Sequence, residues 1–228
     1  MITRYFGVWA IAALVALTGC EVSKPTDPSI VFGPDGQPLP DTGNGGGPAA
    51  GAAWQARASL AQTRSGLAVA ALGNHLYALG GASSEGGLLA SVERYDINAD
   101  AWEPAAPLPS GRTFLAGAAA GEKIYALGGI GAGDPVATVD VYDPATGAWG
   151  AGAPMGTARW GLAACELGGK LYAVGGFDTA GKALGTVEVF DPASGAWQPL
   201  ASLPTPRGML GVAALDGKLY AVGGSVGA

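Results

Sequence analysis

The residues of this chain that could do chemistry are arginines at a nearly fixed spacing. They are Arg64, Arg112, Arg159 and Arg207, in steps of 48, 47 and 48 residues. A ring of such cations could bind an anionic ligand. Alternatively, each of the first three could pair with an acid that follows 28 or 29 residues later: Glu93, Asp140 and Glu188. Because a feature present in every repeat more often stabilises the repeat, we favour the structural ion pair.

The remaining reactive side chains are scarce. His75 is the only histidine, so the sequence offers neither a histidine-based metal site nor a nucleophile with a histidine base. It aligns with Lys123, Lys170 and Lys218, which favours a surface position. Cys165 aligns with Ala70, Ala118 and Ala213, and free cysteine behaves as a small hydrophobic residue. We therefore expect no catalytic residues, no metal and no cofactor.

Two further series of residues share the spacing of the arginines and define a repeat. Tryptophans stand at Trp54, Trp102, Trp149 and Trp197. Glycine pairs stand at Gly80-Gly81, Gly128-Gly129, Gly175-Gly176 and Gly223-Gly224. A repeat of this length that encodes strands and turns is typical of a radial array of small sheets.

The second repeat shows what each unit encodes. Residues 115–120 and 123–127 form two short apolar runs around a turn, and residues 138–142 alternate between apolar and polar. A tight turn over 143–147 contains proline and glycine, and Trp149 opens a last strand. Each unit is thus predicted to be a four-stranded antiparallel sheet. Large aromatic residues would bury its faces against the neighbouring units.

The repeated motif is a glycine pair, then an aromatic residue with aspartate, then a tryptophan. The last two elements stand at Tyr95-Asp96 and Trp102, Tyr142-Asp143 and Trp149, and Phe190-Asp191 and Trp197. The motif resembles the Kelch repeat, and the match covers Trp54 to Gly224. The resemblance implies an all-β, Kelch-type β-propeller of four-stranded antiparallel blades.

The repeats divide the chain into units at 64–111, 112–158 and 159–206, a partial unit at 207–228, and an outer strand at 54–63. In Kelch propellers a terminal strand commonly completes the last blade, and Trp54 resembles that strand. About 3.5 blades are present, whereas propellers have about four to eight. We therefore expect an incomplete propeller from a longer chain, in preference to an open or oligomeric arc.

The N-terminal residues predict export. Arg4 precedes an apolar stretch at 8–17, so residues 1–19 read as a signal peptide. Leu17-Thr18-Gly19-Cys20 resembles the lipobox of bacterial lipoproteins, which implies a lipid on Cys20; the alternative is an ordinary signal with a chance cysteine. The proline- and glycine-rich residues 20–53 would form a flexible tether. Glu21 after the cysteine resembles an outer-membrane sorting signal, so we expect a lipid-anchored protein of the bacterial cell envelope.

Composition limits the partners. The chain has 49% hydrophobic and 13% charged residues and a formal net charge of −6. It therefore lacks the basic surface that nucleic-acid binding requires. The expected partners are a protein or glycan at the envelope, and the membrane through the lipid anchor.

Kelch proteins usually bind ligands on the loops between the second and third strands and between blades. The interblade positions are Ser65, Thr113, Trp160 and Gly208, and the other loop has Ala82, Ile130, Phe177 and Ser225 at equivalent places. Trp160 and Phe177 could form an exposed aromatic platform; alternatively both pack beneath their loops. Asp178, like Asp134 and Glu85, could accept hydrogen bonds. The candidate ligand-binding residues are Ser65, Thr113, Trp160, Ile130, Phe177 and Asp178.

Three functions remain open. We favour a non-catalytic binding or scaffold module of an envelope lipoprotein. The alternative is a periplasmic carbohydrate-active enzyme, since Kelch-type propellers include a sialic acid mutarotase, which needs only an acid/base pair and sugar contacts. They also include a copper-dependent galactose oxidase, whose metal site a single histidine does not supply. The third function is a passive structural domain of a larger surface protein.

Overall fold

The structure, a computed structural model, describes residues 56–227. All regular secondary structure in that range is β-strand. The predicted signal peptide, Cys20, the tether and Trp54 lie outside the described residues. Within the predicted outer strand, residues 56–63 contain no strand. Backbone N–H groups there donate to acidic side chains instead, as Ala58 does to Asp100 Oδ1 at 3.0 Å.

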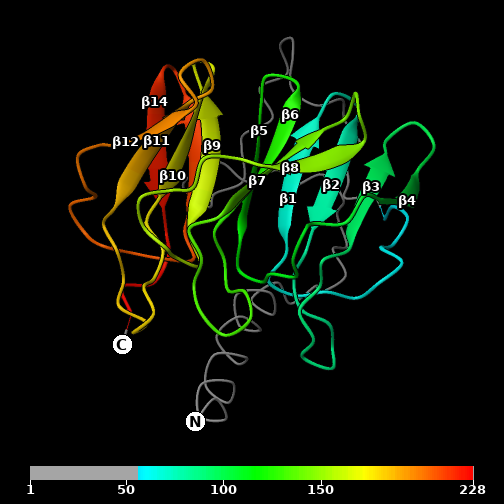
Figure 1. Cartoon of the computed structure of the whole chain (residues 1–228), viewed down its shortest axis with the longest axis horizontal. Coiled ribbons are helices and arrows are strands. Elements are labelled where there is room, and N and C mark those ends of the chain that lie inside the picture. The colour runs from blue at the N-terminus through cyan, green and yellow to red at the C-terminus, as the bar shows by residue number, and fades with distance from the viewer. Residues whose placement is uncertain (1–55, 228) are drawn as a thin grey trace, which may run out of the picture. The chain divides into compact units, whose positions relative to one another are not determined.

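Within residues 56–227, fourteen strands form three four-stranded sheets and one two-stranded sheet, which follow one another across Figure 1 from cyan to red. Blade 1 consists of β1 (Ala68–Leu72), β2 (His75–Leu79), β3 (Val92–Asp96) and β4 (Ala101–Ala105). Blade 2 consists of β5 (Ala116–Ala120), β6 (Lys123–Leu127), β7 (Val139–Asp143) and β8 (Ala148–Ala151). Blade 3 consists of β9 (Ala163–Leu167), β10 (Lys170–Val174), β11 (Val187–Asp191) and β12 (Ala196–Pro199). The half-blade consists of β13 (Gly211–Leu215) and β14 (Lys218–Val222).

Every blade is an antiparallel meander in which sequential strands are neighbours. The predicted all-β fold with four-stranded antiparallel blades is therefore confirmed, and the strands expected in the second repeat agree with β5 to β8 to within a residue or two at each end. The first strands β1, β5, β9 and β13 lie next to one another, so they form the inner edge of the blades.

The strand register is the same in each blade, which explains the place of Cys165. Cys165 pairs with Tyr172 in the first two strands of blade 3. The equivalent pairs are Ala70 with Tyr77, Ala118 with Tyr125 and Ala213 with Tyr220. Burial, and secondarily the charge of Glu166, raise the pKa of the Cys165 thiol. The cysteine thus fills a position that takes a small side chain, as predicted.

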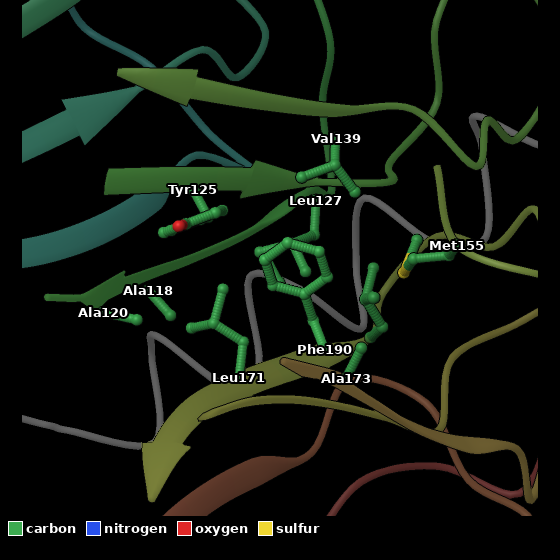
Figure 2. Packing of buried hydrophobic residues seen from close by; sticks show 11 residues of the cluster. Ala118, Ala120, Tyr125, Leu127, Val139, Met155, Leu171, Ala173 and Phe190 are labelled. Atoms are coloured by element: carbon green, nitrogen blue, oxygen red, sulfur yellow. The ribbon is translucent and has the colours of Figure 1, made fainter. Parts of the chain in front are cut away.

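Apolar clusters join neighbouring blades face to face. Between blades 2 and 3, Tyr125 and Phe190 pack with ring centroids 5.8 Å apart, in one apolar cluster with Leu127 and Leu171 (Figure 2). Between blades 1 and 2 the corresponding rings are those of Tyr77 and Tyr142, at 5.7 Å. These aromatic contacts bury the sheet faces that a lone blade would expose to water.

The tryptophans fasten each blade to the segment before it. Trp149 Nε1 donates to Ala106 O at 2.8 Å, and Trp197 Nε1 donates to Ala153 O at 2.9 Å. Trp102 Nε1 makes the same bond to Ala58 O at 2.9 Å. The repeated indole therefore combines apolar packing with one fixed hydrogen bond per blade.

The glycine pairs stand where backbones from two blades approach each other. A Cβ on Gly80 would lie 2.7 Å from Arg112 O, and one on Gly128 would lie 2.6 Å from Arg159 O. Both residues have positive φ, near 58°. Glycine is therefore required at these positions for space as well as for conformation.

Candidate functional site

The two predicted series of loop residues lie side by side in the structure. Each interblade residue forms a β-bridge with the second-to-third-strand loop of its own blade. The bridges are Ser65–Ala82, Thr113–Ile130, Trp160–Phe177 and Gly208–Ser225. We call the surface formed by these eight residues, together with Phe114 and Met209, the loop face. Residues 17 positions apart in the sequence are thus brought together by the hairpin between them.

A chain of backbone hydrogen bonds links the blades along the loop face. Phe114 N–H donates to Gly66 O at 2.7 Å, Gly161 N–H to Phe114 O at 2.9 Å, and Met209 N–H to Gly161 O at 2.6 Å. All four residues have φ between 53° and 62°. The left-handed conformation costs a residue other than glycine about 1–2 kcal/mol. Sequence reasoning missed Phe114 and Met209, although the glycines at the two equivalent positions were a signal.

Aromatic residues concentrate on the loop of blade 3. The rings of Trp160 and Phe177 lie 4.8 Å apart, and those of Phe114 and Trp160 lie 5.5 Å apart. Trp160 is half-buried, and its Nε1 donates to Asp178 O at 3.2 Å. Phe114 is also half-buried. Two aromatic rings are therefore partly accessible on this surface.

Phe177 does not form the exposed platform that the sequence suggested. Its exposed fraction is 0%, so it contacts no ligand directly. Its ring packs against the backbone of Gly208, where a Cβ would overlap with it. The missing side chain at Gly208 is what creates the space for the ring. Phe177 thus supports Trp160 from below.

The other predicted residues divide between surface and interior. Ser65 is exposed, Ile130 and Asp178 are half-buried, and Thr113 is buried, with only 7% of its surface exposed. Asp178 Oδ1 accepts hydrogen bonds from the backbone N–H groups of Ala180 and Lys182, both at 2.9 Å. The Asp178 carboxylate therefore holds the conformation of its own loop. Asp134 and Glu85 are exposed on neighbouring loops.

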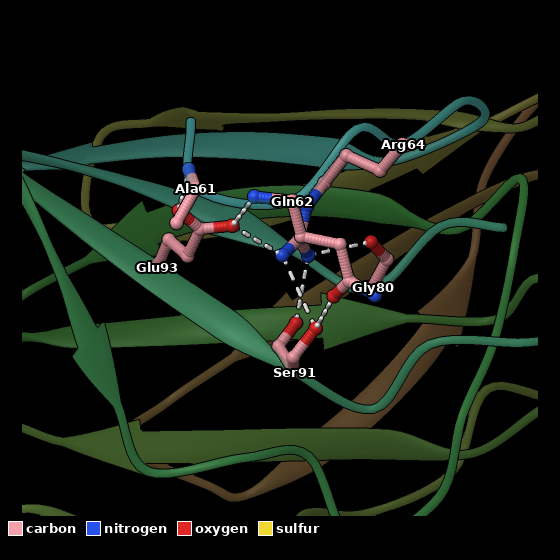
Figure 3. Close-up of polar contacts among 6 residues, drawn as sticks. All are labelled: Ala61, Gln62, Arg64, Gly80, Ser91 and Glu93. Carbon is pink, nitrogen blue, oxygen red and sulfur yellow. Dashed lines mark hydrogen bonds and ion pairs between the residues drawn. The ribbon is translucent and has the colours of Figure 1, made fainter. Parts of the chain in front are cut away.

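The first three repeated arginines form the predicted ion pairs. Arg64 Nη2 lies 2.6 Å from Glu93 Oε1, while Nη1 donates to Gly80 O and Ser91 O at 2.9 Å (Figure 3). Arg112 pairs with Asp140 and Arg159 with Glu188 in the same way. The three arginine side chains have exposed fractions of 0%, 1% and 0%. They therefore brace their blades and do not form an accessible ring of cations.

Burial is the main influence on the pKa values of Arg112, Asp140 and Arg159. It lowers the pKa of the Arg112 guanidinium and raises the pKa of the Asp140 carboxyl, because a dry environment penalises each charged form. It also lowers the pKa of Arg159. Since arginine stays protonated in proteins, the mutual attraction of the partners offsets part of the lost hydration.

The described residues offer little for acid–base or metal chemistry. Residues 56–227 contain no group of three or more His, Cys, Asp or Glu that could hold a metal ion. An open groove of about 430 Å³ between blades 2 and 3 is lined by Tyr125, Trp149 and Phe190. Its charged residues, Lys123 and Asp143, are 3.4 Å apart and pair with each other. In the same part of the chain no helix is long and apolar enough to cross a bilayer.

The comparisons with known proteins agree with this architecture. Residues 53–224 match a protein-family model described as the KLHDC2/KLHL20/DRC7 Kelch-repeats domain. The match includes all three blades and the half-blade. No curated protein gives a significant match to the chain.

Proposed function

Because the chain belongs to the Kelch-repeat family, we propose that it is a non-catalytic binding module that contacts a protein or glycan through the loop face. Membership in the family indicates a protein-interaction or scaffold module. The elements that stabilise the blades repeat from unit to unit. In contrast, the interblade position of the loop face changes from serine to threonine, tryptophan and glycine. Variation at this position can determine which ligand binds, because the residues that stabilise the blades stay the same.

The observation that carries the proposal is the pair of half-buried rings, Trp160 and Phe114, 5.5 Å apart on the loop face. Partly exposed aromatic rings supported from below are effective anchors for a protein side chain or the apolar face of a sugar. Phe177 and Asp178 provide that support, one by packing and one by accepting the indole N–H.

The N-terminal sequence supports an envelope location for this module. Residues 1–19 would direct export, and acylation of Cys20 would anchor the protein without a membrane-spanning segment. Residues 20–53 would then serve as a spacer between the lipid and the blades. The location proposed is the bacterial outer membrane.

Binding to a panel of envelope glycans and purified envelope proteins tests the proposal. The variant Trp160→Ala should lose at least about tenfold in affinity, as expected for a truncated aromatic anchor. The matched control is Ile97→Ala, which removes an apolar side chain that is 50% exposed outside the loop face. Unchanged binding by Trp160→Ala, or sialic acid mutarotase activity of the chain, would overturn the proposal.

A further inference from the structure

The open groove of about 430 Å³ lies between two complete blades, where β7 and β8 of blade 2 approach blade 3. Its lining includes Val141 of β7 and Gly150 of β8, which pair with each other across these strands, and Phe190 of β11. Because both blades have all four strands, the groove does not depend on the half-blade. Its shape follows from the side chains that blade 2 presents to blade 3.

Blade 1 presents different side chains at the equivalent place. Arg94 and Glu103 occupy the register positions of Val141 and Gly150. Arg94 Nη2 lies 2.9 Å from Glu103 Oε2, so two long side chains meet across the outer strands of that blade. In blade 2 a valine and a glycine stand there instead. The lack of such a pair leaves the groove open.

The groove offers hydrogen-bonding groups of both kinds. The ammonium of Lys123 donates, the carboxylate of Asp143 accepts, and the hydroxyls of Tyr125 and Thr146 can do either. The side chains of Lys123 and Asp143 are 48% and 34% exposed, so both reach solvent while they pair with each other. A ligand in the groove would therefore meet donors and acceptors together.

The hydroxyl of Tyr125 differs from its equivalent in blade 1. There, the hydroxyl of Tyr77 shares a hydrogen bond with the Arg94 side chain. Burial raises the pKa of Tyr125 and the charge of Lys123 opposes that shift, so the ammonium lies near the phenol. Within residues 56–227 no side chain hydrogen-bonds to the Tyr125 hydroxyl. This hydroxyl is therefore protonated at neutral pH and available to a ligand.

We propose that the groove binds an uncharged saccharide of one or two rings. The charges of Lys123 and Asp143 sum to zero, which favours a neutral ligand over an ionic one. The hydroxyls of a sugar both donate and accept, so they match the polar groups of the groove. The apolar face of the ring would pack against Val141 and Phe190. Sites for small molecules occupy about 300–1,000 Å³, and the groove lies at the lower end of that range.

The groove is separate from the loop face. Lys123 begins β6, whereas Ile130 of the loop face follows the opposite end of the same strand. The inference therefore does not depend on the proposed function, and the two can fail independently. The loop-face variant Trp160→Ala should bind a small saccharide as the parent chain does.

Saturation-transfer difference NMR on the full chain tests the inference, with maltose, lactose and N,N′-diacetylchitobiose as the probes. At least one of them should bind saturably, with a dissociation constant of about 1 mM or lower. The absence of saturable binding for all three would overturn the inference.

The substitution Gly150→Glu closes the groove with the side chain that blade 1 has at this position. A Cβ at Gly150 meets nothing within 4 Å, so the chain should still fold. Saccharide affinity should fall at least about tenfold, because the new side chain occupies the space of the ligand. The matched control is Ala196→Glu, which places the same side chain at an exposed position of β12 and should bind normally. Equal binding by the two variants would contradict the assignment of the site.

A rescue experiment separates loss of the site from loss of the fold. Adding Arg94→Val and Glu103→Gly to the Gly150→Glu chain gives blade 1 the two residues that leave blade 2 open. Saccharide binding should return, now beside His75 and Asp96, which pair as Lys123 and Asp143 do. A chain that stays inactive in binding would show that the missing side-chain pair does not create the site.

Discussion

Arg159 Nη2 and Glu188 Oε2 lie 2.8 Å apart in a buried ion pair that joins the interblade loop to the third strand of blade 3. Glu188 Oε1 also accepts the backbone N–H of Gly156 at 2.7 Å. The arginine further donates to Gly175 O and Thr186 O, at 3.2 and 2.8 Å. These contacts hold the interblade loop against the third strand of its own blade. Arg64 and Arg112 make the equivalent ion pairs in blades 1 and 2.

The substitution Arg159→Ala should lower the free energy of unfolding by about 3–5 kcal/mol, because it leaves Glu188 buried without its partner. Arg207→Ala is the matched control, since no described carboxylate pairs with that arginine, and its effect should be much smaller. Urea unfolding monitored by tryptophan fluorescence measures both. Equal losses of stability in the two variants would show that leaving the Glu188 carboxylate without its partner adds nothing to the destabilisation.

The close packing of Phe177 on Gly208 predicts that Gly208→Ala destabilises the chain by about 1–3 kcal/mol, because the new methyl group overlaps with the ring. Replacing the ring with the smaller leucine side chain in the double variant Gly208→Ala/Phe177→Leu should restore part of the lost stability. Gly150→Ala is the control, because a Cβ there meets nothing within 4 Å. If thermal unfolding shows additive losses in the double variant, the two residues are not coupled.

The turns between third and fourth strands predict a loss of stability in acid. Hydrogen bonds from backbone N–H groups lower the pKa of Asp96 and Asp143. The pKa of Asp191 is lowered mainly by a hydrogen bond from the Lys170 side chain, and secondarily by one from a backbone N–H. Since these pKa values are lower in the folded chain than in the unfolded chain, protonation favours unfolding. The stabilisation is complete above the ordinary aspartate pKa of about 4 and is lost as the pH falls through the folded values.

The triple variant Asp96→Asn, Asp143→Asn and Asp191→Asn isolates this effect. Its melting temperature should change less between pH 5 and pH 2 than that of the parent chain. Differential scanning calorimetry at a series of pH values gives the comparison. A triple variant that keeps the full acid dependence would place the titrating groups elsewhere.

Cys165 should react slowly with iodoacetamide in the folded chain, because burial raises its pKa and reduces the thiolate fraction. Mass spectrometry of the peptide that contains Cys165 follows the reaction separately from that of Cys20. The rate should rise to that of an ordinary thiol in urea. Cys165→Ala should fold normally, because alanine occupies the equivalent position in β1, β5 and β13. Fast alkylation of the native thiol would contradict its half-buried position.

Much of the fold could be predicted from sequence because its parts recur. The period aligned Arg112 with Arg159 and Asp140 with Glu188, so that a contact in one unit implied the same contact in the next. Tyr77 and Tyr125 were likewise placed in second strands by the glycine pairs that follow them. Repetition thus substitutes for the alignment of homologues that such inferences normally require.

The loop face was less predictable, because it depends on differences between units. The burial of Phe177 follows from an absent side chain at Gly208, a residue in the next unit. The positive φ of Phe114 and Met209 results from the blade-to-blade hydrogen bonds. These bonds join backbone groups, so the identities of the neighbouring side chains do not reveal them. The lack of strand structure in residues 56–63 reflects acceptors supplied by Glu93 and Asp100. Each of these features requires knowledge of which neighbour faces the residue.

The most direct test of the binding proposal keeps Trp160 and places a photo-crosslinking amino acid at position 209 of the full chain in intact cells, with position 97 as the control. Both Met209 and Ile97 have exposed side chains, but only Met209 lies on the loop face, beside Gly161. Irradiation should attach one envelope protein or glycan at position 209 and none at position 97. A crosslink from position 97, or the absence of one from position 209, would contradict binding through the loop face.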